Sequence, residues 1–212
     1  MAQKMIEQDA YIYHEITRLF PNARCELKYT TQIELLIAII LSAQTTDDSV
    51  NRVTDNLFKK YHCIQDYADV NLSELENDIH HLGLFKSKAK YIKLTCIKLR
   101  DQYAGIVPND QKALESLPGV GRKTANVFIS EWYKMPRIAI DTHVKRVSIR
   151  LGLVSDTDSL EQIENQLIAK YDPSNWIDLH HKLIFFGRYF CTAEQPKCKQ
   201  CPLLSICQKP LL

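Results

Sequence analysis

Residues 117–125 read Leu-Pro-Gly-Val-Gly-Arg-Lys-Thr-Ala, and residues 139–143 read Ala-Ile-Asp-Thr-His. Asn109 or Asp110 can cap a short helix ahead of the first stretch, and Pro118 must end that helix because proline has no N–H for the hydrogen-bond ladder. A second amphipathic helix then begins at the second glycine. The pattern predicts two helices joined by a glycine turn, with free N–H groups that can bind a phosphate.

Two side chains in these stretches can carry chemistry. Lys123 lies in the first turn of the second helix, and Asp141 lies where a further helix is expected to begin. The positive end of the helix dipole disfavours a protonated lysine and favours an ionised aspartate. A neutral amine can act as a nucleophile, and a carboxylate can stabilise a cation. The same residues also fit a solvated surface lysine and an ordinary helix N-cap.

The composition of the 212-residue chain, with 45% hydrophobic and 25% charged residues, is that of an ordinary soluble globular protein. The net charge of +2 is unevenly distributed. Residues 112–150 hold eight basic and three acidic side chains, whereas residues 66–78 hold five acidic side chains and no basic one. This asymmetry favours a surface that faces DNA, although a solvated helix face can give similar counts.

No segment has the properties of a targeting or membrane sequence. Residues 1–10 lack the apolar run of a signal peptide and contain acids that a transit peptide avoids. The apolar run Ile33–Leu41 is too short to cross a bilayer. The seven cysteines do not form the dispersed, even set of a disulfide framework. We therefore expect a cytoplasmic protein.

Apolar residues recur at helical spacing along the whole chain without an alternating strand pattern, so the sequence predicts an all-α fold. The expected helices around the hairpin have these bounds or caps: Met5–Phe20, 32–43 with a capping box at Thr31, one capped by Asp47 or Asp48, one opened by a capping box at Ser73 and ending at Gly83, Ser87–Tyr103, Thr142–Leu151, Ser159–Tyr171 and Ser174–Phe190.

The last 22 residues hold four cysteines with the spacing C-x6-C-x2-C-x5-C: Cys191, Cys198, Cys201 and Cys207. Four thiols this close together in a cytoplasmic chain indicate a metal site. Zinc and a [4Fe–4S] cluster both take four sulfur ligands, and the spacing does not decide between them. The remaining cysteines lie singly on apolar faces and are expected in the core: Cys25, Cys63 and Cys96.

Together the L-P-G-V-G-R-K-T-A hairpin, the A-I-D-T-H segment and the four-cysteine ending resemble the helix-hairpin-helix (HhH-GPD) DNA glycosylases, and within them the endonuclease III family. The resemblance covers nearly the whole chain in order. It implies a six-helix domain over residues 25–135, with the hairpin at about 110–131. Residues 1–24 and 136–212 would form a second helical domain with a cluster loop at 191–207. A DNA-binding cleft would lie between the domains.

The resemblance also implies an activity. The chain would be a monomeric, bifunctional DNA glycosylase and abasic-site lyase of bacterial type, bound to the nucleoid. It would remove oxidised pyrimidines from duplex DNA through a Schiff base on Lys123, with Asp141 as the second catalytic residue. The strand would then be cut 3′ to the abasic site by β-elimination. The four cysteines would hold [4Fe–4S] rather than zinc.

The resemblance implies a set of DNA-binding residues, of which the first two would insert into the duplex: Gln44, Leu84, Gly119, Val120, Gly121, Arg122, His143, Lys145 and Arg146. From the residues alone, a loop glutamine is usually solvated and a leucine usually packs. Removal of a base from the stack, however, requires a side chain to fill the gap.

The first loop between the cysteines departs from the family pattern. Glu194 and Gln195 make this loop less basic than in relatives, which argues against a strong DNA contact there.

Three rival functions remain open. Adenine glycosylases for mispairs share the hairpin, the aspartate and the cluster, but have no lysine at the position of Lys123. A thymine mismatch glycosylase of the same fold also fits the sequence. A non-enzymatic helix-hairpin-helix module would need neither Lys123 nor Asp141.

Overall fold

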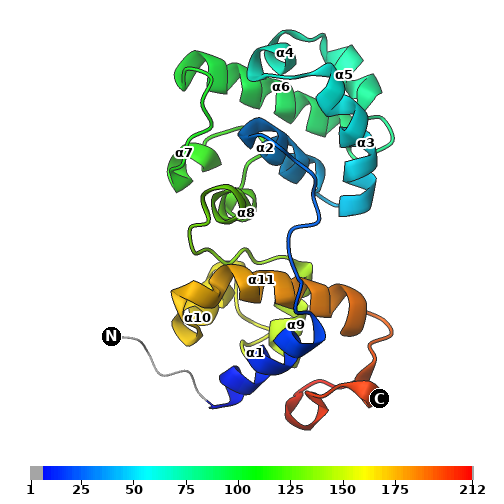
Figure 1. Ribbon diagram of the computed structural model, residues 1–212, viewed down its shortest axis with the longest axis vertical. Coiled ribbons are helices and arrows are strands. Elements are labelled where there is room, and N and C mark those ends of the chain that lie inside the picture. The colour runs from blue at the N-terminus through cyan, green and yellow to red at the C-terminus, as the bar shows by residue number, and fades with distance from the viewer. Residues whose placement is uncertain (1–6, 212) are drawn as a thin grey trace. The chain divides into compact units, whose positions relative to one another are not determined.

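The computed structural model describes residues 7–211, and all regular structure in that range is helical, which confirms the predicted all-α fold. The beginning of the expected first helix, at Met5, lies outside the described residues. The elements are α1 (Glu7–Leu19), α2 (Gln32–Leu41), α3 (Asp47–Lys60), α4 (Ile64–Asp69), α5 (Leu72–Asp78), α6 (Phe85–Gln102), α7 (Gln111–Glu115), α8 (Arg122–Tyr133), α9 (Thr142–Arg150), α10 (Leu160–Lys170), η1 (Pro173–Asn175), α11 (Trp176–Phe185), η2 (Phe186–Phe190), η3 (Cys198–Gln200) and η4 (Leu204–Ile206) (Figure 1).

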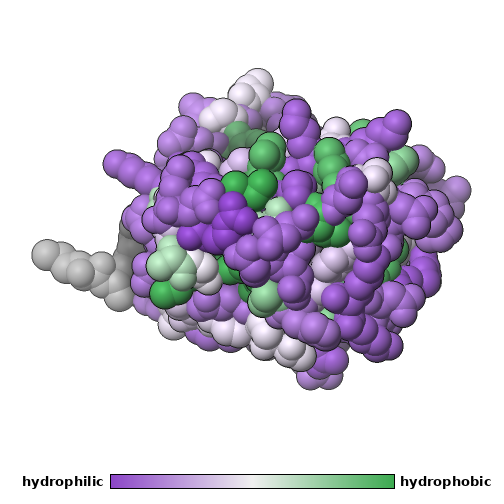
Figure 2. Space-filling view, turned by 90° about the horizontal axis from the view of Figure 1, so that it is seen from above, coloured by the Kyte–Doolittle hydropathy of each residue, from purple (hydrophilic) through white to green (hydrophobic). Residues whose placement is uncertain are grey.

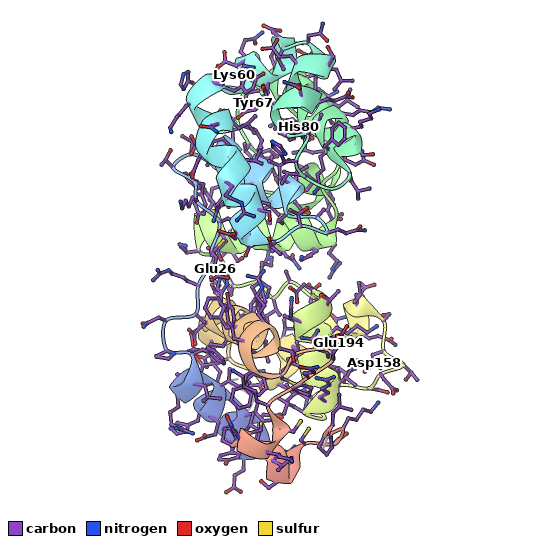
Figure 3. All side chains as sticks on the ribbon, turned by 90° about the vertical axis from the view of Figure 1, so that its right-hand side faces the viewer. Glu26, Lys60, Tyr67, His80, Asp158 and Glu194 are labelled. Carbon is purple, nitrogen blue, oxygen red and sulfur yellow. The ribbon has the colours of Figure 1, made fainter. Side chains whose placement is uncertain are left out.

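The chain divides into two compact units. The hairpin unit is Glu26–Tyr133, with α2 to α8, and the terminal unit combines α1 with the residues from Lys134 onward. Side chains labelled in Figure 3 belong to both, with Tyr67 in the interior of the hairpin unit. The face shown in Figure 2 is mostly hydrophilic, with hydrophobic residues in small separate groups. No helix within residues 7–211 is long and apolar enough to cross a membrane.

Helix α2 lies at the centre of the hairpin unit. All its residues from Leu35 to Leu41 are buried, and it packs against α3, α6 and α8. The expected capping box is confirmed: Glu34 N donates to Thr31 Oγ1 at 3.3 Å, and Thr31 N donates to Glu34 Oε2 at 3.2 Å. Because each fully buried leucine or isoleucine contributes about 1.5–3 kcal/mol, this helix is the main hydrophobic anchor of the unit.

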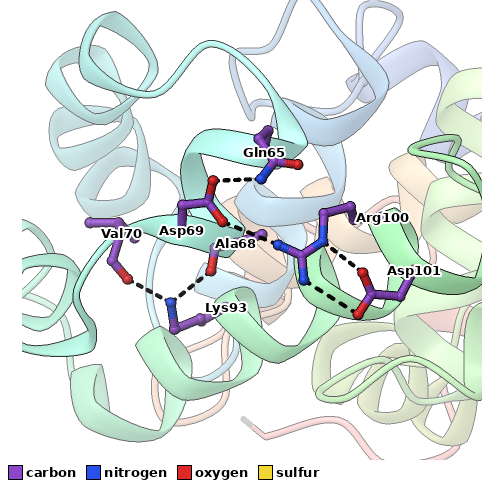
Figure 4. A network of polar contacts seen from close by, with 7 residues as sticks. All are labelled: Gln65, Ala68, Asp69, Val70, Lys93, Arg100 and Asp101. Atoms are coloured by element: carbon purple, nitrogen blue, oxygen red, sulfur yellow. Dashed lines mark hydrogen bonds and ion pairs between the residues drawn. The ribbon is translucent and has the colours of Figure 1, made fainter.

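Helix α4 was not expected from the sequence. Its C-terminal carbonyls are bound by α6, because Lys93 Nζ donates to Ala68 O at 2.7 Å and to Val70 O at 2.6 Å (Figure 4). Arg100 Nη1 adds a bond to Asp69 Oδ1 at 3.1 Å. Helix ends leave carbonyls without partners, so these contacts stabilise a helix that is too short to persist alone.

Some local predictions were wrong. Asn71 rather than Ser73 caps α5, since Asn71 Oδ1 accepts from Ser73 N at 3.1 Å, and this helix ends at Asp78. Thr46 caps α3 in place of the two aspartates that follow it. Among the lone cysteines, Cys96 is buried as expected, but Cys63 is exposed and Cys25 is only partly buried.

The terminal unit has its own core around α9 and α11. Ile12 and Ile16 of α1 are fully buried in it, together with Val144 of α9 and Leu183 of α11. The expected helix over Ser174–Phe190 is instead a 3-10 turn, α11 and a π-helical turn at Phe186–Phe190. Because a π turn adds a residue to the helical repeat, it redirects the chain just before the first cysteine of the C-terminal loop.

Candidate functional site

The predicted hairpin is present, and α6 packs against its turn. Asp110 caps α7, with its Oδ1 accepting from Ala113 N at 2.9 Å. Gly119 has φ of 78°, and a Cβ at this position would lie 2.7 Å from Tyr91 Cβ. Because α6 approaches so closely and the backbone is left-handed, glycine is required here.

Helix α6 also holds the turn by hydrogen bonds. Thr95 Oγ1 donates to Pro118 O at 2.7 Å, and Lys98 Nζ donates to Ser116 O at 2.8 Å. These bonds occupy carbonyls of the turn and leave the start of α8 facing outward. The hairpin is therefore a preformed element, and its side chains do not need to reorder to accept a ligand.

The exposed tip of the hairpin consists of Gly121, Arg122 and Lys123. Lys123 has no hydrogen-bond or ion-pair partner in the described part of the chain. Val120 is 4% exposed and its N–H bonds to Leu117 O at 3.1 Å, so this residue shapes the turn rather than offering a side chain. The backbone N–H groups of Lys123 and Thr124, in the first turn of α8, suit an anion, with the Lys123 amine beside them.

Asp141 is the N-cap of α9. Its Oδ1 accepts from Val144 N at 2.7 Å, while its second oxygen has no hydrogen-bond partner within residues 7–211. The carboxylate is partly exposed. One oxygen therefore fixes the orientation of the group, and the other can face a ligand.

Three basic residues of α9 that were expected to bind DNA differ in their surroundings. Lys145 is partly exposed and has no partner among the described residues. Burial lowers the pKa of His143, and the nearby charges of Arg146 and Arg188 lower it further. The Asp141 carboxylate has the opposite effect on this pKa and raises it. Arg146 Nη2 donates to Gly187 O at 2.7 Å and to Cys191 O at 3.2 Å. Two of its guanidinium nitrogens thus bond to the protein, while Nη1 has no hydrogen-bond partner within residues 7–211.

Gln44 and Leu84 are both exposed, in two loops of the hairpin unit. Gln44 follows the end of α2 by three residues and has φ of 53°, and Leu84 precedes α6 with φ of 60°. Left-handed backbone is uncommon for non-glycine residues and is costly without a compensating environment. Both side chains that were expected to enter the duplex therefore project from strained, outward-facing positions.

The four C-terminal thiols line one pocket together with apolar side chains. Those apolar side chains are Leu151, Phe186, Phe190 and Leu204. Among residues 7–211, no group of three or more histidine, cysteine or acidic side chains is arranged to hold a metal ion. The four thiols nevertheless share one pocket wall, and those of Cys201 and Cys207 feel the charges of the other cysteines.

Arg150 forms hydrogen bonds with both ends of the four-cysteine loop. Its Nη1 donates to Thr192 O at 2.7 Å and lies 3.3 Å from Cys191 Sγ, and its Nη2 donates to Ala193 O at 2.9 Å. Its carbonyl accepts from Gln208 N at 2.9 Å, at the other end of the loop. One residue of α9 thus binds both ends of the loop.

Residues 37–173 match the family described as HhH-GPD superfamily base excision DNA repair protein. The chain is 47% identical to an endonuclease III of Bacillus subtilis over 204 residues, which cover 96% of this chain and 93% of the relative. It is 40% identical to an endonuclease III of Escherichia coli, with 89% of each chain covered. The chain belongs to the endonuclease III family of the HhH-GPD superfamily.

Solved structures agree with this membership. A trapped endonuclease III–DNA covalent intermediate has a TM-score of 0.93 and 48% identity, with 96% of this chain and 97% of that chain covered. A thermostable thymine-DNA glycosylase has a TM-score of 0.84 but only 24% identity, with 95% and 96% covered, so it shows the fold alone. The predicted helix-hairpin-helix glycosylase fold is confirmed.

For two residues of this endonuclease III homologue, sequence reasoning missed the contacts that they make. Lys88 was expected only to line the groove beside Leu84, together with Phe85 and Lys86. Lys88 is 3% exposed, and its Nζ donates to Thr45 Oγ1 at 2.7 Å, next to Gln44. Arg150 was counted only as one basic residue among eight, without a role in the cysteine loop. Neither could be found from spacing, because both act through partners that are more than 40 positions away in the chain.

Proposed function

We propose that this chain is a bifunctional DNA glycosylase and abasic-site lyase that removes oxidised pyrimidines from duplex DNA. The observation that carries the proposal is Lys123, an exposed amine with no partner within residues 7–211, in the first turn of the second hairpin helix. A covalent protein–DNA intermediate of a 48% identical endonuclease III supports a covalent route. We further propose that the protein acts as a monomer on the nucleoid, in the cytoplasm.

The hairpin supplies binding and position. Backbone N–H groups around Gly119 and Gly121 hold a phosphate, and Arg122 and Lys145 add positive charge. This binding is independent of sequence and weakens as salt is added. Arg146 can add positive charge through its Nη1 group alone, since its Nη2 group is bonded to Gly187 O and Cys191 O. The damaged nucleotide is turned out of the duplex so that its sugar reaches Lys123.

The chemistry proceeds in two stages. The Lys123 amine attacks C1′, and the base departs with the electron pair of the glycosidic bond. Positive charge develops on the sugar, and the Asp141 carboxylate stabilises it. The Schiff base that forms on Lys123 acidifies the C2′ proton, whose loss expels the 3′ phosphate by β-elimination. Hydrolysis of the imine then restores the lysine.

The experiment that tests this function compares substrates under single-turnover conditions. We expect release of thymine glycol and cleavage at an abasic site, with little release of thymine from a G·T mismatch. Preferential action on the mismatch would favour the thymine glycosylase alternative. Binding without base release or strand cleavage would favour a non-enzymatic DNA-binding module.

Gln44 and Leu84 are proposed to fill the gap left by the extracted nucleotide. Leu84→Ala is therefore expected to lower base release from a paired duplex by roughly tenfold, because extraction costs a few kcal/mol and the wedge offsets part of that cost. Release from the same lesion in an unpaired bubble should change little. Leu94→Ala, at another exposed leucine, is the matched control. Equal losses on both substrates would rule out the wedge role.

The four C-terminal cysteines are proposed to bind a [4Fe–4S] cluster. Support comes from the set of four thiols that line one pocket and from the membership of the chain in the endonuclease III family. The cluster would supply the structural core of a loop that has little hydrophobic core of its own. Arg150, at 3.3 Å from Cys191 Sγ, would hold the loop against α9.

Cys198→Ser is expected to lose iron and sulfide and to leave the C-terminal loop open to proteases, because the loop depends on its metal. The wild-type protein should be yellow-brown, with broad absorption in the visible range. Iron and sulfide analysis after anaerobic purification, together with limited proteolysis, measures both effects. Cys63→Ser, at an exposed cysteine outside the loop, is the control. Stoichiometric zinc without sulfide would contradict the cluster assignment.

A further inference from the structure

Lys88 is a buried cation without a counter-ion. It lies near the start of α6, is 3% exposed, and has no ion-pair partner in the part of the chain that the structure describes. Burial lowers the pKa of Lys88. Its Nζ donates a hydrogen bond to Thr45 Oγ1 at 2.7 Å. Since an unpaired buried ammonium is costly, the stability of the fold does not account for this residue.

The contacts of Lys88 reach both loops from which the proposed wedge residues project. Thr45 directly follows Gln44, and the backbone N–H of Lys88 donates to Leu84 O at 3.0 Å. Gln44 and Leu84 have φ of 53° and 60°. Left-handed backbone at such residues persists only where surrounding contacts hold it in place. Lys88 therefore contacts one strained loop through its side chain and the other through its backbone.

We propose that Lys88 is a positioning residue that locks the Gln44 loop to the Leu84 turn, so that both side chains enter the duplex as one rigid pair. The inference rests on the proposed function, because it needs an enzyme that extracts a nucleotide. A hydrogen bond from an ammonium is stronger than one between neutral groups, which suits a link between two exposed loops. Holding both wedges before contact avoids the entropy cost of ordering them on the DNA.

Substitutions at both ends of the link test the proposal. Lys88→Met removes the donor, and Thr45→Val removes the acceptor while keeping its shape. Thr45→Ser keeps the hydroxyl as a conservative rescue. Lys86→Met removes the same charge from an exposed neighbour on α6, so it reports the loss of attraction to DNA alone.

The readout is the ratio of single-turnover base release from a paired duplex to release from the same lesion in an unpaired bubble. We expect Lys88→Met and Thr45→Val each to lower this ratio by roughly tenfold, as loss of a wedge would. Thr45→Ser should keep the wild-type ratio. Lys86→Met should weaken binding to both substrates alike. Melting temperatures measured in parallel detect a general loss of structure, which would lower both activities and leave the ratio unchanged.

Coupling to the wedge provides a second measurement. In a Leu84→Ala background, Lys88→Met should have little further effect on the ratio, because the two changes act through the same step. Independent effects, or a wild-type ratio in either Lys88→Met or Thr45→Val, would overturn the inference. If wild-type protein releases no base and forms no trapped complex, the proposed function itself fails. If wild-type protein is active and Leu84→Ala is selective, the Lys88 result tests the positioning role alone.

Discussion

Lys123→Gln is expected to abolish strand cleavage and borohydride-trapped complex, with a loss of roughly 10⁴-fold or more, because the nucleophile and the electron sink are removed together. DNA binding should persist, since the hairpin is held by Thr95, Lys98 and Gly119 and not by Lys123. Single-turnover cleavage of an abasic duplex, borohydride trapping and a binding assay measure the three properties.

Lys112→Gln is the matched control for this change. Lys112 is an exposed lysine of α7, in the first helix of the same hairpin, so its replacement removes one charge and no nucleophile. Cleavage should remain in this variant. A Lys123→Gln protein that still cut abasic DNA through a trappable imine would mean that another amine is the nucleophile.

Asp141→Asn is expected to slow release of an oxidised pyrimidine by roughly 10³-fold, because a neutral amide cannot stabilise the developing positive charge on the sugar. The variant should retain more activity on a preformed abasic site, where the open aldehyde condenses with Lys123 without departure of a base. Folding should be preserved, since asparagine can still accept the hydrogen bond from Val144 N. Rates on the two substrates measure the difference.

Asp172→Asn provides the control for the loss of an N-cap carboxylate. Asp172 caps η1 through a bond from Ser174 N at 2.9 Å and has no proposed part in the chemistry. If Asp141 were only a cap, both variants would release bases at near-wild-type rates. That outcome would remove Asp141 from the mechanism.

Local features of the fold were predictable where the side chain that decides them bonds to its own backbone neighbours. The caps at Thr31, Asp110 and Asp141 are confirmed, because each bonds to a backbone N–H three residues away. Where several polar residues compete for one helix start, the pattern does not decide, and Asn71 caps α5 in place of Ser73.

Features that depend on distant contacts could not be predicted. Helix α4 is stabilised by Lys93 and Arg100 of α6, and its only local signal is Asp66, whose Oδ2 accepts from Cys63 N at 3.1 Å at a helix start that has a cysteine as N-cap. The sequence also did not predict that Cys63, at the start of α4, would be exposed, because its exposure depends on how this helix packs.

In the candidate site, too, features set by neighbouring residues in the chain were predictable, and features set by tertiary contacts were not. The exposed position of Lys123 follows from its place in the first turn of a helix after a glycine turn, which the sequence motif describes well, whereas the exposure of Leu84 was expected only from the family resemblance. Arg146 belongs to a basic segment, yet its guanidinium is bound to backbone carbonyls near the cysteine loop. Charge counts cannot reveal such bonds, because they depend on tertiary contacts. The hydrogen bond from Lys88 to Thr45, on which we base its proposed positioning role, depends on tertiary contacts in the same way.

Borohydride trapping followed by peptide mapping is the most direct test of the central claim, which is that Lys123 forms the covalent intermediate. Wild-type protein would be incubated with thymine-glycol and abasic duplexes, reduced, digested and examined by mass spectrometry. The account predicts one DNA adduct per chain on the peptide that contains Lys123, with both duplexes. Base release without any adduct, or an adduct on another lysine or on the N-terminal amine, would contradict it.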